Sequence, residues 1–174
     1  VYISSAREFM QTPEEMVRIF SGQEGVEFNI FLSEGESHNS GGFLNSNIHI
    51  YEHGNPKFYQ ILEECAGIIS TAGHSLLSEA LYLGIPIYAI PVSLYEQHLN
   101  ALVIEKNGFG IAYPKIAPQK LADFIENIPL FEKTIKSDKK ALLRGAGQDK
   151  IIEFLDGLFS ALSLNSGFGE IRKK

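Results

Sequence analysis

The residues best suited to chemistry lie between Cys65 and Gly110. A short apolar run there leads into a turn of small residues, and then into a helical segment that opens with hydroxyl side chains. The first amides of a helix have no partner within it, and the helix dipole adds positive charge, so such a turn can hold a diphosphate. The predicted diphosphate seat consists of Thr71, Ala72, Gly73, His74 and Ser75.

Within this turn, Gly73 would let the backbone approach a phosphate closely, because glycine has no side chain. Small residues between a strand and a helix also permit tight packing of the two elements without any ligand. The turn alone therefore leaves both interpretations open.

A carboxylate, Glu79, follows the glycine by six residues. If it faces the turn, its two oxygens can accept hydrogen bonds from both hydroxyls of a ribose. A glutamate near the start of a helix is also favoured by the helix dipole alone. Glu79 is therefore a candidate ribose ligand, with helix stabilisation as the alternative.

A second polar cluster, Glu96, Gln97 and Asn100, combines a carboxylate with two amides. These groups suit several hydroxyls of one sugar, so we predict sugar contacts here. The start of an ordinary helix would use the same residue types, which is the competing explanation.

A third cluster, His53, Gly54 and Asn55, follows an expected strand. A turn at this place can meet a nucleobase through its backbone groups, so these residues are candidates for base binding. Glycine and asparagine are also the usual residues of a plain turn, and that interpretation is the more common one.

The segments that must position these residues alternate between strand and helix patterns. Apolar runs predict strands over 1–5, 26–32, 47–51, 67–70, 86–90 and 110–113. Helical patterns lie over 12–20, 56–64, 75–83, 96–107, 118–128 and 138–162, the last broken near 145–147. We expect an α/β fold, a Rossmann-like doubly wound parallel sheet of about six strands with C-terminal helices. Ligands bind such sheets beyond the carboxyl ends of the strands, where every candidate residue lies.

Composition and length exclude several classes of protein. A chain of 174 residues suits one domain, which we place at 1–162, with a polar, glycine-containing tail at 163–174. The net charge of -6 argues against a nucleic-acid surface. The single cysteine fits a reducing, cytoplasmic setting, and no apolar run reaches the length of about 18 residues that a membrane span needs. Because the chain starts at Val1 without a methionine, we expect it to belong to a longer protein.

Taken together, the residues resemble the C-terminal, nucleotide-sugar-binding domain of a GT-B glycosyltransferase. The pattern is a glycine turn, a glutamate six residues later, Gly-x-Pro, a second proline, and an acid-Gln-x-x-Asn-Ala run ending at Ala101. It is similar to the family 28 and UDP-glucuronosyltransferase-like proteins, including the bacterial N-acetylglucosaminyltransferase that forms lipid II. Uncharacterised archaeal and bacterial glycosyltransferase-like proteins have near equivalents of EALYLGIP and EQHLNAL. Leu76 stands where the family often has a hydroxyl, and Glu96 replaces an aspartate, so the nucleotide and sugar stay open.

The resemblance implies a metal-independent, hexosyltransferase-type enzyme that uses a nucleotide-sugar, UDP-linked, as substrate and needs no cofactor. It implies that the turn from Thr71 to Ser75 holds the diphosphate, that Glu79 holds the ribose and that Glu96 and Gln97 face the sugar. The general base lies in the N-terminal half of such enzymes, so no catalytic residue is nominated and this fragment is expected to be inactive alone. Its partners would be the donor and a missing acceptor domain or subunit. Membrane contact, at the inner face, would arise only through a lipid acceptor.

Three alternatives to this function stay open. The first is a nucleotide-sugar epimerase or hydrolase of the same architecture, which would consume donor without an acceptor. The second is a separate donor-binding subunit that needs an acceptor-binding partner. The third is a degenerate binding module, which Leu76 in place of a hydroxyl would favour.

Overall fold

The structure is a computed structural model that describes residues 1–3, 11–33, 47–92, 95–138 and 147–165. By its internal contacts the chain divides into two units, Val1–Leu143 and Arg144–Lys174. The first unit contains the sheet and every candidate site residue. The second contains the helix α7 (Gly147–Asn165). The predicted boundary at 162 stays a prediction.

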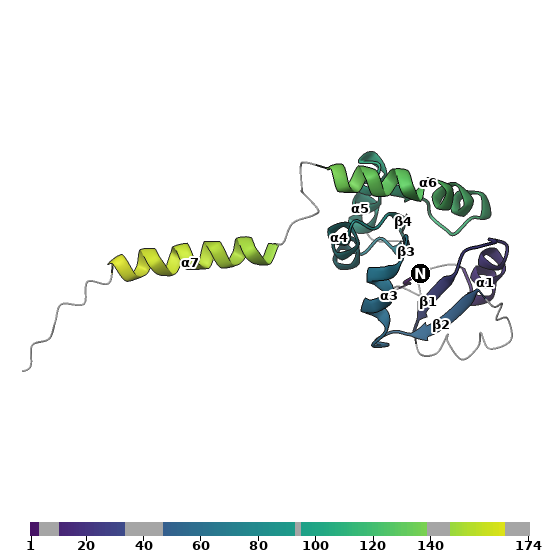
Figure 1. The fold of residues 1–174 in the computed structure, drawn as a ribbon, viewed down its shortest axis with the longest axis horizontal. Helices are drawn as coiled ribbons and strands as arrows, with labels where there is room; N and C mark the ends of the chain where they lie inside the picture. Colours follow the sequence, from purple (N-terminus) through teal and green to yellow (C-terminus); the bar gives the residue numbers. More distant parts are fainter. Residues whose placement is uncertain (4–10, 34–46, 93–94, 139–146, 166–174) are drawn as a thin grey trace, which may run out of the picture. The chain divides into compact units, whose positions relative to one another are not determined.

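All paired strands of the first unit run parallel, and they form two groups, one on each side of the N-terminal segment (Figure 1). β1 (Phe28–Leu32) pairs with β2 (Ile48–Glu52), while β4 (Ile87–Ile90) lies between β3 (Ile68–Thr71) and β5 (Gly110–Ala112). Tyr2 bridges the two groups, because it pairs with β1 on one side and with β3 on the other. The order β2-β1-Tyr2-β3-β4-β5 is that of a doubly wound Rossmann sheet, which confirms the predicted fold class.

The number of strands is smaller than predicted. Five strands are present in the described residues, and the strand expected over 1–5 is reduced to single bridges at Tyr2. Residues 4 and 5 of that expected strand lie outside the described ranges. The segment nevertheless has the position of the central strand, since the Tyr2 amide donates to the Ile69 carbonyl and the Phe31 amide donates to the Val1 carbonyl.

The helices begin and end close to the positions that the sequence predicts. α1 (Pro13–Ser21) has a complete capping box, in which the Thr12 side chain and the Glu15 amide are paired. α3 (Phe58–Glu64), α4 (His74–Leu83) and α5 (Tyr95–Lys106) follow β2, β3 and β4. The exception is α6 (Pro118–Ser137), expected to end near 128 but continuing through Pro129.

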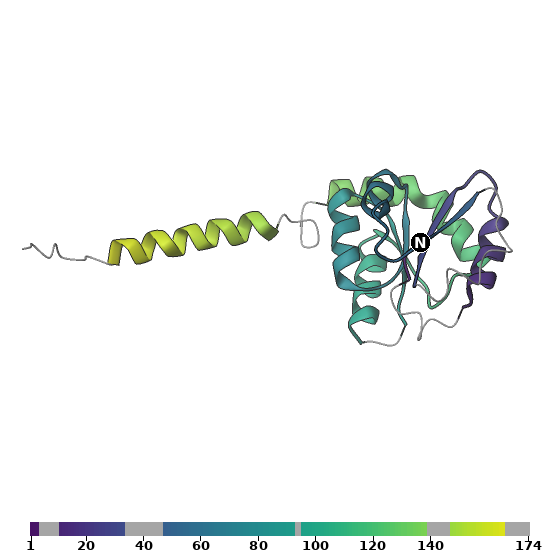
Figure 2. The ribbon, with the colours of Figure 1, turned by 90° about the horizontal axis from the view of Figure 1, so that it is seen from below.

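The helices cover both faces of the sheet, as Figure 2 shows. Neighbouring residues of a strand point to opposite faces. In β4, Tyr88 and Ile90 belong to a buried cluster with α1 and α6, whereas Ile87 and Ala89 belong to a second cluster with α3, α4 and α5. The first unit is thus a three-layer α/β/α domain whose sheet is apolar on both sides, as expected for parallel strands.

The second unit consists of an amphipathic helix. α7 begins at Gly147, where a break was expected, and exposes the apolar side chains Ile151, Phe154, Leu158 and Phe159. Residues 166–174 of the expected tail lie outside the described residues. Within the described ranges, no helix combines the length and apolar character that a membrane crossing requires.

Candidate functional site

The candidate site lies where the order of the strands reverses. From the central Tyr2 segment, the chain proceeds to β1 and β2 on one side and then returns to β3, β4 and β5 on the other. α1, which follows Tyr2's segment, packs on one face of the sheet, and α4, which follows β3, packs on the other. Ligands of doubly wound sheets bind in the crevice at such a point. The predicted diphosphate turn follows β3 at this point.

The connection from β3 to α4 is buried and hydrogen-bonded at its first residues and exposed to solvent at its last. Thr71 and Ala72 are buried, and the Ala72 amide donates to the Ile90 carbonyl at 3.0 Å. Gly73 is half-buried, while His74 and Ser75 are exposed. The five predicted residues are thus the end of β3 (Thr71), the two connecting residues Ala72 and Gly73, and the start of α4 (His74 and Ser75).

α4 starts at His74 without a side chain to cap it, because its N-cap residue is Gly73. Gly73 has φ −72° and ψ 135°, which any residue can adopt. A Cβ atom at this position would meet only the Thr71 carbonyl oxygen, at 3.7 Å. The fold does not require glycine here, so the absence of a side chain leaves space in front of the first amides of α4.

Ser75 and Glu79 are four residues apart on α4, and residues at this spacing share one face of a helix. Both are exposed, while Leu77, Ala80 and Leu81 form the buried face. Ser78 bonds back to its own helix, since its hydroxyl donates to the His74 carbonyl at 2.9 Å. A hydroxyl and a carboxylate thus follow the uncapped turn on the solvent side of α4.

The predicted sugar cluster, Glu96, Gln97 and Asn100, lies on α5 beside this turn, and all three side chains have hydrogen bonds within the protein. Gln97 is only 5% exposed, and its Oε1 accepts a hydrogen bond from the Val92 amide at 2.9 Å. Asn100 Nδ2 donates to the Ala72 carbonyl at 2.9 Å. Glu96 is exposed and 3.4 Å from Asn100 Nδ2. The predicted sugar contacts of these residues stay predictions.

The third cluster follows β2 on the same edge of the sheet. The His53 ring stacks on Tyr2 with centroids 4.6 Å apart, and its Nε2 lies 3.2 Å from the Phe31 carbonyl oxygen. The Asn55 side chain accepts from the Lys57 amide at 3.0 Å, which is an ordinary turn contact. Two strand positions separate β2 from the β3 edge, about 14 Å across the sheet. The base contacts predicted for His53, Gly54 and Asn55 stay predictions.

The groups with shifted pKa values lie away from this edge. Burial raises the pKa of the Cys65 thiol, which precedes β3. Burial also raises the pKa of Tyr88, in the middle of β4, to about 12. Among the described residues, no group of three or more His, Cys, Asp and Glu side chains could hold a metal ion.

A cavity of about 560 Å³ in the first unit is also separate from the site. Its walls come from the amino ends of β1 and β3, from α3 and from the amino-terminal half of α6. None of the predicted site residues lines it. The candidate site is therefore an open surface at the carboxyl edge of the sheet and not this cavity.

The family model described as "Glycosyl transferase family 1" matches residues 3–129 of this chain. An uncharacterized glycosyltransferase of Methanopyrus kandleri is 36% identical over 62 residues, which are 34% of this chain and 18% of that protein. A second, from Methanosarcina acetivorans, is 32% identical over 75 residues, 40% of this chain and 20% of that protein. The chain thus spans about a fifth of the length of these curated relatives.

Solved structures of glycosyltransferases have the same fold. The glycotransferase of kitacinnamycin has a TM-score of 0.65 at 17% identity, over 82% of this chain and 37% of that chain. The spinosyn rhamnosyltransferase SpnG in complex with thymidine diphosphate has a TM-score of 0.59 at 23% identity, over 74% of this chain and 34% of that chain. The spinosyn forosaminyltransferase SpnP has a TM-score of 0.61 at 16% identity, over 91% of this chain and 43% of that chain. These likenesses show the GT-B glycosyltransferase fold and confirm the resemblance read from the sequence.

Proposed function

Because this chain belongs to glycosyl transferase family 1, we propose that it is the donor-binding half of an enzyme that transfers a sugar from a nucleotide-sugar to an acceptor. The observation that carries the proposal is the turn after β3. It lies at the switch point of the sheet. The backbone conformation of Gly73 is one that any residue can adopt, so the fold does not require a glycine there. The first turn of α4 has no side-chain cap.

In the proposed complex, the turn from Thr71 to Ser75 holds the diphosphate through the first amides of α4. Glu79, one helical turn beyond Ser75, accepts hydrogen bonds from the ribose. The amides and the dipole of α4 stabilise the charge that develops on the leaving diphosphate, and no metal ion is needed for this. Glu96, which is exposed at the start of α5, faces the sugar in this proposal.

The donor is proposed to be UDP-linked and to serve as a substrate, with no cofactor. A nucleoside diphosphate is supported by SpnG, whose structure was obtained with thymidine diphosphate. The acceptor is proposed to be bound by a further domain or a partner subunit that also supplies the general base. SpnG has likewise been obtained with the spinosyn aglycone, and this chain covers 33% of SpnG in that structure.

The proposal is tested by a thermal-shift screen of this chain with UDP, TDP, GDP, ADP and UDP-glucose. A ligand at about 100 times its dissociation constant stabilises the folded state by about 2.7 kcal/mol, which is easily measured. We expect at least one diphosphate to raise the melting temperature. If none does at millimolar concentration, donor binding by this chain is excluded.

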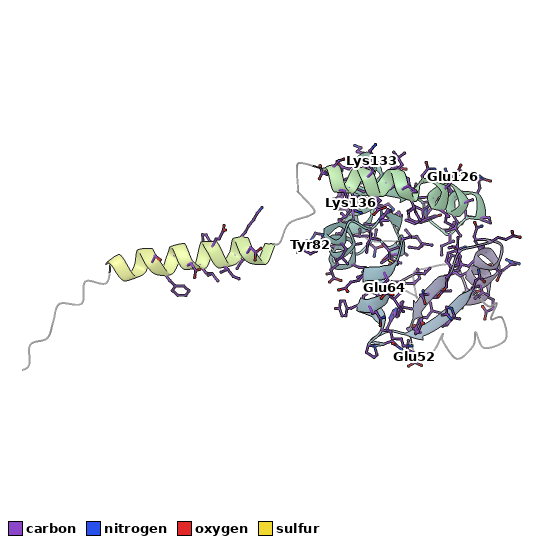
Figure 3. All side chains as sticks on the ribbon, in the orientation of Figure 1. Glu52, Glu64, Tyr82, Glu126, Lys133 and Lys136 are labelled. Atoms are coloured by element: carbon purple, nitrogen blue, oxygen red, sulfur yellow. The ribbon has the colours of Figure 1, made fainter. Side chains whose placement is uncertain are left out.

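A pair of variants locates the binding. Glu79→Ala should reduce the shift given by the diphosphate, because the ribose loses its carboxylate partner. Glu126→Ala is the matched control, since Glu126 is an exposed glutamate on the outer side of α6 (Figure 3). Equal shifts for both variants and the original chain would place the nucleotide elsewhere.

A further inference from the structure

The first two turns of α5 are bonded to the ends of two different strands. Gln97 accepts from the amide of Val92, which follows β4. Asn100 donates to the carbonyl of Ala72, which follows β3. Since Gln97 is 5% exposed and Asn100 is half-buried, both side chains lie under the surface of the candidate site.

Asn100 completes the anchoring of Ala72. The amide of Ala72 donates to the Ile90 carbonyl at 3.0 Å, so β4 holds one side of this residue. Its carbonyl accepts from Asn100 Nδ2 at 2.9 Å, so α5 holds the other. Asn100 bridges 28 residues of sequence to reach it.

The bond acts on the start of α4 through the planarity of the peptide. The Ala72 carbonyl and the Gly73 amide belong to one rigid plane, so fixing one fixes the other. Gly73 is the N-cap of α4 and has no side chain to hold it in place. The amide of the same peptide donates to the Thr71 carbonyl at 2.5 Å, so the Asn100 contact and this short-range bond together set the direction in which the chain enters α4 and the aim of its first free amides.

We propose that Asn100 is a positioning residue that preforms the diphosphate seat by holding the Ala72–Gly73 peptide, in place of acting as a direct sugar ligand. This inference rests on the proposed function, because it assigns the seat to a nucleoside diphosphate. A preformed site binds more tightly, since the ligand does not have to order the turn.

The two roles of Asn100 differ in what its loss does to a ligand without a sugar. A sugar ligand matters for UDP-glucose and leaves the affinity for UDP unchanged. A positioning residue matters for both, because both bind through the diphosphate. The affinities of UDP and UDP-glucose, measured by isothermal titration calorimetry, separate the two roles.

The variants are Asn100→Ala and Asn100→Asp. Both remove the Nδ2 donor, and the aspartate keeps the shape of the side chain while facing the Ala72 carbonyl with an acceptor. Asn107→Ala and Asn107→Asp are matched controls, since Asn107 directly follows α5 and donates within its own segment, to the Val103 carbonyl at 2.8 Å. If Asn100→Asp fails to fold, Asn100→Ala carries the test.

A second readout needs no ligand at all. Hydrogen exchange in the free protein reports on the Ala72 amide and on the Leu77 amide, which donates to the Gly73 carbonyl at 3.3 Å. Loss of the Asn100 contact should raise exchange over 72–77 about tenfold, through local opening of the turn. The Asn107 controls should leave exchange in this segment unchanged.

The expected result is an affinity about tenfold lower for both UDP and UDP-glucose in the Asn100 variants, together with faster exchange over 72–77. A loss confined to UDP-glucose, or unchanged exchange over 72–77, overturns the positioning role. If the original chain binds no diphosphate and exchange still rises, the proposed function fails while the positioning of the turn by Asn100 stands.

Discussion

At the scale of single residues, Gly73 combines an ordinary backbone conformation with an open space in front of it. Replacing it with alanine has two small effects on stability. Alanine is a poorer N-cap than glycine, but it reduces the entropy of the unfolded chain, and the two terms oppose each other at about 0.5–1 kcal/mol each. A methyl group facing the first amides of α4 would obstruct a phosphate. We expect Gly73→Ala to change the free energy of unfolding by less than about 1 kcal/mol while lowering diphosphate affinity about tenfold.

Urea unfolding and calorimetric titration of the same Gly73→Ala preparation check this prediction. Gly110→Ala is the contrasting variant, because Gly110 has φ 154° and a Cβ atom there would lie 1.8 Å from the Ile87 carbonyl oxygen. That substitution should prevent folding. A Gly73→Ala protein that binds diphosphate as well as the original chain would show that the turn is small for packing reasons alone.

Tyr88 gives a prediction on pH. Its side chain is fully buried, and its hydroxyl donates to the Lys115 carbonyl at 2.7 Å. Burial raises its pKa to about 12, against about 10 for an unfolded chain. The folded state therefore holds this proton more tightly, and the resulting stability is fully present below about pH 10 and is lost as the pH rises toward 12.

Tyr88→Phe should cost about 1–3 kcal/mol at pH 7.5, because the Lys115 carbonyl loses its buried donor. The difference from the original chain should narrow above about pH 10, where the tyrosine begins to lose its advantage. Urea unfolding at pH 7.5, 9 and 11 measures both the loss of stability at neutral pH and its decrease at high pH. Tyr59→Phe serves as the control, since Tyr59 is 65% exposed. This substitution should change the free energy of unfolding by less than about 0.5 kcal/mol at every pH. A constant difference across this range would contradict the prediction.

The residues of the candidate site show how far sequence reasoning reaches. The positions of Gly73, Ser75, Glu79 and Glu96 after β3 and β4 could be predicted, because strand, turn and helix patterns place them at one edge of the sheet, and their binding roles stay predictions. The bonds of Gln97 and Asn100 could not, since an amide that suits a sugar hydroxyl suits a backbone group equally well. Burial decides between such partners, and burial depends on how α5 packs against the strand ends.

At the scale of elements, the alternation of strand and helix was predicted because apolar periodicity is local. The errors occur where distant contacts override a local signal. Pro129 marks a helix end in sequence, yet α6 continues to Ser137. Its last turns place Phe131 and Ile135 against the two buried clusters, and this burial outweighs the hydrogen bond that proline removes.

Pro129→Ala should therefore stabilise the first unit. Pro129 is exposed, so little packing is lost, while α6 gains a backbone hydrogen bond and a residue of high helix propensity. We expect a gain of about 1–3 kcal/mol in the free energy of unfolding by urea. Lys133→Ala, at an exposed position of the same helix (Figure 3), should change it by less than about 0.5 kcal/mol. A loss of stability on replacing Pro129 would mean that the ring contributes more than the missing bond costs.

At the scale of the whole molecule, the sheet explains why the candidate residues meet. Tyr2 lies between β1 and β3, so the chain folds outward from it in both directions, and the turn after β3 is left at the point of divergence. The sequence predicted parallel strands from their alternation with helices. It could not predict that the first strand would be reduced to single bridges, because the pairing of Tyr2 depends on neighbours at positions 31 and 70.

The last prediction concerns activity. This chain carries the proposed diphosphate turn, but it spans 33% to 43% of the glycosyltransferase structures it resembles. Transfer requires an acceptor and a base to activate it, and neither role has a candidate among the described residues. We expect the chain to bind nucleotide-sugar without converting it, so incubation with UDP-glucose and simple alcohol or sugar acceptors should release no more UDP than buffer alone. Gly73→Ala provides the background for that assay, since it should reduce donor binding while leaving the fold intact. UDP release above both backgrounds that requires an acceptor would show that the chain contains a complete transferase, and release without any acceptor would favour a hydrolase instead.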